Sequence, residues 1–209
     1  MLGIRQSTVL VEAPSGVTDR VHVHFTPAGL SRFTAVPAQR LAGRIVSADE
    51  LFPPGMLDRL TADLWNAKTL EKRAFVLDAF FERLLRPLGP REEMAVRLAT
   101  RILETPEVSL AELLHGAPAR IRQVERLFQR LVGVSPRVLV RVARFDRARN
   151  AVLSRDGESL SGIALDAGYY DQAHFNREFR RHASMPPGSY SFCAPSSSQR
   201  SFPARSHAT

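Results

Sequence analysis

The chain has 209 residues, of which 44% are hydrophobic, and a formal net charge of +8. It is long enough for one or two domains with a buried core. It has no apolar run of about 18 residues that would span a membrane and no apolar stretch of a signal peptide at its N-terminus. A single cysteine, Cys193, excludes a disulfide framework. We therefore expect a cytoplasmic protein without a membrane partner.

The positive charge is concentrated in the second half of the chain. Residues 101–209 contain 16 arginines, no lysine and 10 acidic residues, whereas residues 1–100 contain 13 basic and 11 acidic residues. Nine of the arginines lie from Arg120 to Arg149. Such a run fits a solvated surface, and it also fits contacts to phosphates and guanine edges. Charge alone does not separate these two interpretations.

Two β-prone runs, residues 8–11 and 20–25, are predicted to be strands near the N-terminus. Because two strands do not form an independent sheet, they need partners from another chain or from sequence missing upstream. His22 and His24 would lie on one face of the second strand, as a metal site requires. No third ligand follows at a useful spacing, so we predict no metal site and no cofactor.

Two helices are predicted next, at residues 56–67 and 69–85, from leucine and phenylalanine residues at helical spacing. Their apolar stripe is expected to pack in a core, with a dimer surface as the alternative. Pro87 and Pro90 end this region and mark a natural boundary in the chain.

The second half of the chain is predicted to be helical. Residues 91–103 have the pattern of an amphipathic helix. Ser109 and Glu112 have the spacing of a capping box that opens the next helix. A further helix, residues 119–132, is expected to stop at Gly133.

A long helix is expected to begin at Ser135 and Pro136 and to reach residue 154. A shorter helix follows and is stopped by Gly168, which suits the left-handed turn after a helix. Asp171 then caps a basic helix. A helix, a glycine turn and a capped basic helix form the layout of a helix-turn-helix.

The capped basic helix has two different faces. Phe175, Phe179 and His182 fall on one side of a helical projection, and we expect that side to be buried. The other side carries Ala173, His174, Arg177, Arg180 and Arg181.

The same pattern occurs earlier in the chain, at an offset of 51 residues. Arg126, Phe128, Arg130 and Pro136 correspond in this way to Arg177, Phe179, Arg181 and Pro187. An offset held over four matched residues indicates an internal repeat.

These residues resemble the signature of the AraC/XylS family of transcriptional regulators. The resemblance covers about residues 89–192 and is most specific in the second copy of the repeat. The first copy departs from the family spacing by two extra residues near residues 116–119. The matching residues are Arg144, Phe145, Ala148, Leu153, Ile163, Ala164, Gly168, Tyr169, Asp171, Phe175, Arg177, Glu178, Phe179, Pro187 and Tyr190.

The resemblance implies a mainly α fold. A C-terminal tandem helix-turn-helix module of the AraC type, with seven helices, would follow a small α+β segment that resembles the end of a sensory domain. The expected domains are a partial β-strand segment of a regulatory domain at residues 1–52, a helical regulatory or linker region at residues 53–88, the DNA-binding domain at residues 89–192 and a disordered tail at residues 193–209.

By the same resemblance, one helix of each copy would contact DNA. Glu125 lies among the first set, where it would either accept a hydrogen bond from a cytosine or, as we favour, pair with Arg122. The expected DNA-binding residues are Arg122, Gln123, Arg126 and Arg130 in the first copy, and Gln172, Ala173, His174, Arg177, Arg180 and Arg181 in the second.

The predicted function is sequence-specific binding of promoter DNA, with two recognition helices in adjacent major grooves of a double-stranded partner. The sequence leaves open whether RNA polymerase and a small-molecule effector are partners, and it leaves the oligomeric state open as well. The alternative is a protein-interaction adaptor whose helix-turn-helix units no longer read DNA, but acidic or apolar side chains would then replace the arginines. An enzyme is not expected, because Cys193 lacks a basic, structured surrounding and the chain has neither a phosphate loop nor a nucleophile elbow.

Overall fold

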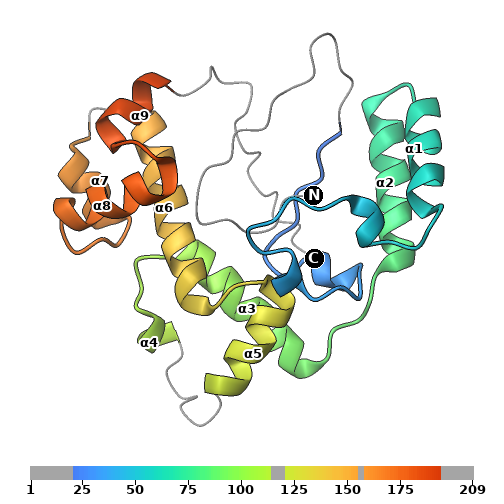
Figure 1. Cartoon of the computed structure of the whole chain (residues 1–209), viewed down its shortest axis with the longest axis horizontal. Coiled ribbons are helices and arrows are strands. Elements are labelled where there is room, and N and C mark those ends of the chain that lie inside the picture. Colours follow the sequence, from blue (N-terminus) through green and yellow to red (C-terminus); the bar gives the residue numbers. More distant parts are fainter. Residues whose placement is uncertain (1–20, 114–120, 155–157, 194–209) are drawn as a thin grey trace. The chain divides into compact units, whose positions relative to one another are not determined.

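The computed structural model describes residues 21–113, 121–154 and 158–193, and these residues are mainly helical (Figure 1). The chain divides into two compact units, residues 1–144 and 145–209, so that the boundary falls within helix α6. Within the described ranges, no helix is both long enough and apolar enough to cross a membrane.

The strand predicted at residues 20–25 is wrong for residues 21–25, which have no regular structure. Phe25 instead packs its ring against those of Phe33 and Phe81, at centroid distances of 5.7 and 5.4 Å. Its apolar side chain is therefore covered by a helix and needs no sheet. Apart from one bridge residue, Ile45, the described part of residues 21–88 contains no β-structure, so the predicted α+β character is not found there. The strand predicted at residues 8–11 lies outside the described residues.

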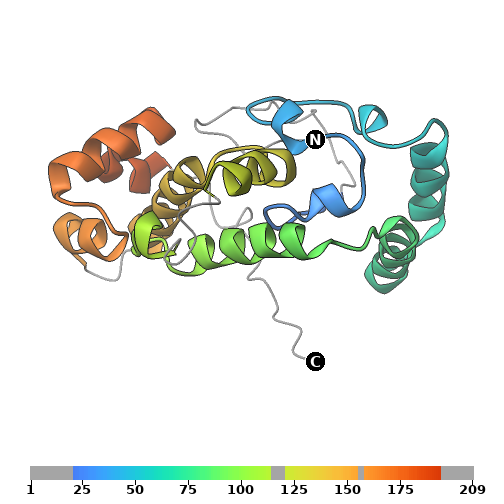
Figure 2. The same cartoon turned by 90° about the horizontal axis from the view of Figure 1, so that it is seen from below.

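Helices α1 (Met56–Asn66) and α2 (Leu70–Leu84) are the two helices that the leucine and phenylalanine spacing predicted, and they form an antiparallel pair (Figures 1 and 2). Thr69 caps α2, because its Oγ1 accepts a hydrogen bond from the Lys72 N–H at 3.3 Å. Phe80 is buried in a cluster that α2 shares with residues before α1, among them Leu41 and Phe52. This part of the predicted stripe is core.

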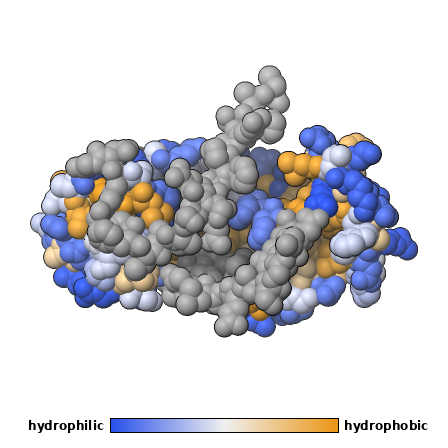
Figure 3. All heavy atoms as spheres, turned by 90° about the horizontal axis from the view of Figure 1, so that it is seen from above, coloured by the Kyte–Doolittle hydropathy of each residue, from blue (hydrophilic) through white to orange (hydrophobic). Residues whose placement is uncertain are grey.

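The rest of the α1–α2 stripe is exposed. Trp65 (72%), Leu70 (78%) and Phe75 (74%) keep most of their surface in solvent. Figure 3 shows hydrophobic surface on the right, where α1 and α2 lie. The core interpretation therefore holds for Phe80 but not for Leu70 and Phe75.

The remaining helices of the first unit share a second core, in which Phe128 is fully buried. The capping box predicted at Ser109 is present: its N–H donates to Glu112 Oε2 at 3.0 Å, and the Glu112 N–H donates to Ser109 Oγ at 3.2 Å. The helices are α3 (Pro90–Glu104), α4 (Leu110–Leu113), α5 (Ile121–Val132) and the start of α6 (Pro136–Ser154).

Two 3-10 turns ahead of α1 pack on α5, and this contact was not predicted from the sequence. They are η1 (Leu30–Arg32) and η2 (Ala38–Arg40), while a third turn, η3 (Ala48–Glu50), leads to α1. A Cβ atom added at Gly133, just after α5, would lie only 2.7 Å from the carbonyl oxygen of Ala38. Gly133 also has a φ of +93°, so the turn and the close contact both require glycine.

The second unit is built around Phe179. Its ring makes edge contacts with the rings of Phe145, Phe175 and Tyr190, at centroid distances of 5.1, 5.4 and 5.4 Å. Gly168 has a φ of +82° and makes the left-handed turn that was predicted. The helices are the end of α6, α7 (Leu160–Asp166), α8 (Gln172–Ala183) and α9 (Pro187–Cys193), so the described part of residues 90–193 has seven helices.

Replacement of Asp171 by alanine should destabilise α8. Asp171 Oδ1 accepts a hydrogen bond from the His174 N–H at 2.6 Å, as expected of the predicted N-cap. Loss of such a cap costs ~1 kcal/mol, so the thermal unfolding midpoint should fall. Asp166→Ala is the control. Asp166 is an exposed residue at the end of α7, so the unfolding midpoint of this variant should not fall. An unchanged midpoint for Asp171→Ala would contradict the capping role.

Replacement of Gly133 by alanine should destabilise the first unit more than the same change at Gly43. Both glycines have positive φ, +93° and +71°, and a left-handed alanine costs about 1–2 kcal/mol. Only at Gly133 would the new Cβ meet Ala38, since at Gly43 nothing lies within 4 Å. Denaturant titration of both variants measures the two free energies of unfolding. Equal losses would show that Ala38 does not pack on Gly133.

Candidate nucleic-acid interface

On α8, packing separates a buried face from a polar one. Phe175, Phe179 and His182 are buried, as predicted, and they fix the rotation of the helix about its axis. The polar face then consists of exposed Gln172, Ala173, Arg177, Arg180 and Arg181 together with half-buried His174.

Local contacts hold several side chains of this polar face. Ser161 Oγ donates a hydrogen bond to Gln172 Oε1 at 2.9 Å. The His174 ring meets the ring of Tyr169 edge-on at 5.5 Å. Arg181 lies 3.8 Å from Glu178, which is a long and solvent-screened ion pair.

Arg177 and Arg180 are the arginines of α8 that stay available for an anion. Within the described ranges, neither has an acidic side chain within 4.0 Å. A guanidinium keeps its charge at any physiological pH and offers a fork of N–H donors that fits phosphate oxygens and the edge of guanine.

On α5, three arginines form a stripe. Arg122, Arg126 and Arg130 are four residues apart, so they follow one another along one face, and all three are exposed, as is Gln123. Glu125 is half-buried and forms no ion pair with Arg122, so the pairing that we favoured is wrong. A pair on a solvated helix surface is worth only a few tenths of a kcal/mol, which is too little to hold two long side chains together.

Arg130 differs from the other two arginines of the stripe. Its Nη2 lies 2.7 Å from Glu92 Oε1, in α3. The same carboxylate pairs with Arg86 at 2.9 Å. The sequence did not identify Glu92 or Arg86 as part of the interface, although Glu92 stands at the third position of α3, where a capping carboxylate is common.

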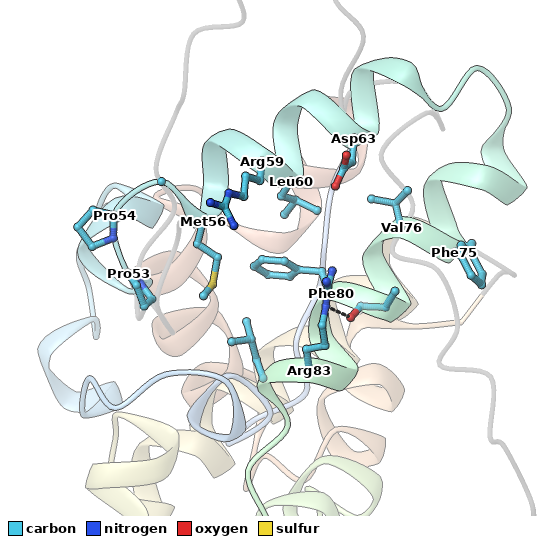
Figure 4. Close-up of a pocket in the computed structure, with 13 residues that line it drawn as sticks. Pro53, Pro54, Met56, Arg59, Leu60, Asp63, Phe75, Val76, Phe80 and Arg83 are labelled. Atoms are coloured by element: carbon cyan, nitrogen blue, oxygen red, sulfur yellow. Dashed lines mark hydrogen bonds between the residues drawn. The ribbon is translucent and has the colours of Figure 1, made fainter.

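A pocket of about 630 Å³ lies in the α1–α2 hairpin and is lined by no residue of α5 or α8 (Figure 4). Apolar side chains, among them Met56, Leu60 and Phe80, line it together with Arg59 and Arg83. It belongs to residues 53–84, outside the region that carries the family resemblance, and we assign no ligand to it.

Among the described residues, no three His, Cys, Asp or Glu side chains come together in the manner of metal ligands. The His22 and His24 rings lie 6.5 Å apart, in a segment without strand structure.

Comparison with known proteins agrees with the geometry of α5 to α9. Residues 117–191 match the family described as "Helix-turn-helix domain". These residues are an AraC-type helix-turn-helix domain. The resemblance to the AraC-type regulators is therefore confirmed for this stretch, and a domain of this type implies DNA binding.

Two curated relatives are similar to the AraC-type half of the chain. The HTH-type transcriptional regulator MtrA of Neisseria gonorrhoeae is 25% identical over 104 residues, which are 49% of this chain and 34% of that protein. The HTH-type transcriptional regulator GbdR of Pseudomonas aeruginosa is 32% identical over 98 residues, 47% of this chain and 26% of that protein. The chain thus spans about a third or less of these relatives. No solved structure matches it significantly.

Proposed function

We propose that the chain is a sequence-specific transcriptional regulator that binds promoter DNA with α5 and α8 in adjacent major grooves. One observation carries this proposal: each helix buries a phenylalanine, Phe128 or Phe179, and turns arginines outward on the opposite face. Exposed arginines in this arrangement suit phosphates and guanine edges. The relatives named as transcriptional regulators share this half of the chain.

Residues at the start of a recognition helix contact base edges, so Gln172, Ala173, His174 and Arg177 would read the sequence. Gln172 accepts from Ser161 and keeps its amide NH2 for an acceptor on a base. Arg180 and Arg181, nearer the end of α8, would contact phosphates. In α5, contacts to bases and phosphates would fall to Arg122, Gln123 and Arg126. Arg130, which the sequence placed among the DNA-binding residues, pairs with Glu92 and is left out of this set.

The length of α6 supports a division of work within one chain. It has 19 residues, which gives about 28 Å at ~1.5 Å per residue. Successive major grooves on one face of DNA are ~34 Å apart. A helix of this length is of the right order to connect two reading units without a second copy of the chain.

An adaptor that binds proteins through the same faces is the rival function. It would need acidic or apolar surfaces there, whereas α5 and α8 expose arginines. Titration of salt against duplex binding separates the two. For a DNA-binding regulator, the logarithm of the binding constant falls linearly with the logarithm of the salt concentration, with a slope of about −0.9 for each phosphate contact. An adaptor shows no duplex binding to titrate.

Arg177→Ala should lower affinity for a selected operator by about 1–3 kcal/mol and relax the base preference at one position. The operator is first selected from randomised duplexes with the wild-type chain. Equilibrium binding is then measured on the operator and on scrambled DNA at several salt concentrations. Arg180→Ala is the matched comparison, because the loss of a phosphate contact should weaken both DNAs alike. If Arg177→Ala also weakens both DNAs equally, Arg177 does not read a base.

A further inference from the structure

Glu92 is the point at which three parts of the first unit meet. Only 12% of its side chain is exposed. Its Oε2 accepts from the Gly89 N–H at 3.1 Å, which caps α3. The two carboxylate oxygens also accept from Arg86, at 2.9 and 3.3 Å, and Oε1 accepts from Arg130 at 2.7 Å.

The carboxylate is charged at neutral pH. Hydrogen bonds from Arg86 lower the pKa of Glu92 from its ordinary value of 4.5, and the opposing effect of burial is smaller. The Arg130 pair is a charge-assisted hydrogen bond at short distance, which is stronger than a neutral one. Arg130 keeps 55% of its side-chain surface, but its guanidinium is held toward α3.

Arg86 connects the same carboxylate to the N-terminal turn η1. The Arg86 N–H donates to the Arg32 carbonyl oxygen at 2.8 Å, and Arg86 Nη2 donates to the Ser31 carbonyl oxygen at 3.3 Å. Arg32 Nε in turn donates to the Arg86 carbonyl oxygen at 3.4 Å. Because η1 also contacts α5, the ion pairs and the packing act on the same helix.

The consequence for α5 lies in the stripe of three arginines. Arg122 and Arg126 have no acidic partner within 4.0 Å in the described structure, whereas Arg130 has Glu92. A phosphate that is to bind Arg130 must displace the Glu92 carboxylate, whose side chain is 12% exposed. The positive charge of the stripe is therefore reduced at the end of the helix next to η1 and η2.

We propose that Glu92 is a positioning residue of the DNA interface, which holds Arg130 against α3 so that α5 offers two rather than three arginines to DNA. Arg86 ties this hold to the N-terminal turn. The inference rests on the proposed function. Glu92 would thereby set the balance between phosphate contacts and base contacts in the first helix-turn-helix unit.

Glu92→Gln tests this role, because glutamine keeps the size of the side chain and an acceptor for Gly89 but removes the charge. With Arg130 released, the full chain should bind duplex DNA more tightly, and the log–log salt slope should steepen by about 0.9, the value for one more phosphate contact. Glu93→Gln is the matched control. It removes the same charge one residue along α3, where Glu93 pairs with Arg97 at 3.4 Å, and the salt slope of this variant should equal that of the wild type.

Two further variants distinguish positioning from a structural role. Arg130→Ala alone should leave the wild-type slope unchanged, because Arg130 is not engaged with DNA. Glu92→Gln combined with Arg130→Ala should return the steepened slope to the wild-type value. Should Glu92→Gln fail to fold in a thermal melt, Arg130→Ala in the wild-type background still decides the question.

Two results would overturn the inference alone: a Glu92→Gln slope equal to that of Glu93→Gln, or a slope that Arg130→Ala lowers by about 0.9 in the wild-type background. Absence of salt-dependent duplex binding by the wild-type chain would instead overturn the proposed function, and this inference with it.

Discussion

Burial of one phenylalanine in each of α5 and α8 is the constraint on which the AraC-type half of the chain depends. Phe128 in α5 and Phe179 in α8 are both fully buried. A buried aromatic ring fixes the rotation of a helix, because turning it outward would expose a large apolar surface. The packing of the ring alone then directs arginines on the other side of the helix toward solvent. Each phenylalanine thus stabilises the fold and also sets the direction in which the charged face of its helix points.

The first unit joins residues that the sequence assigns to different regions. Ala28 belongs to the core of α3 and α5, and Gly133 closes against Ala38. Residues 26–42 therefore contribute to the packing of the first helix-turn-helix unit rather than only preceding it. A change in this segment would reach α5 through packed atoms and through the Arg86–Glu92–Arg130 ion pairs.

Interactions within one or two turns of the chain were predicted well. The caps at Ser109 and Asp171 and the turn at Gly168 depend on residues three or four positions apart, which a sequence displays directly. The buried and exposed faces of α8 also followed from helical periodicity.

Interactions between distant residues were not predicted. Residues 21–25 have the composition of a strand, but Phe25 packs its ring against Phe33 and against Phe81 of α2, which is distant in the sequence. Leu70 and Phe75 fit a core pattern, yet they lie near the α1–α2 turn, where Trp65 of α1 is exposed as well. Glu92 and Arg130 are 38 positions apart, and no local pattern connects them.

The exposure of Trp65 has a spectroscopic consequence. It is the single tryptophan of the chain, it lies on the open side of α1, and the ammonium of Lys68 stands 5.7 Å from the centre of its ring. An indole in water already emits at long wavelength in the folded protein. Its fluorescence is therefore a poor reporter of the melting of the α3–α9 cores, but a sensitive reporter of any molecule that covers the α1–α2 hairpin.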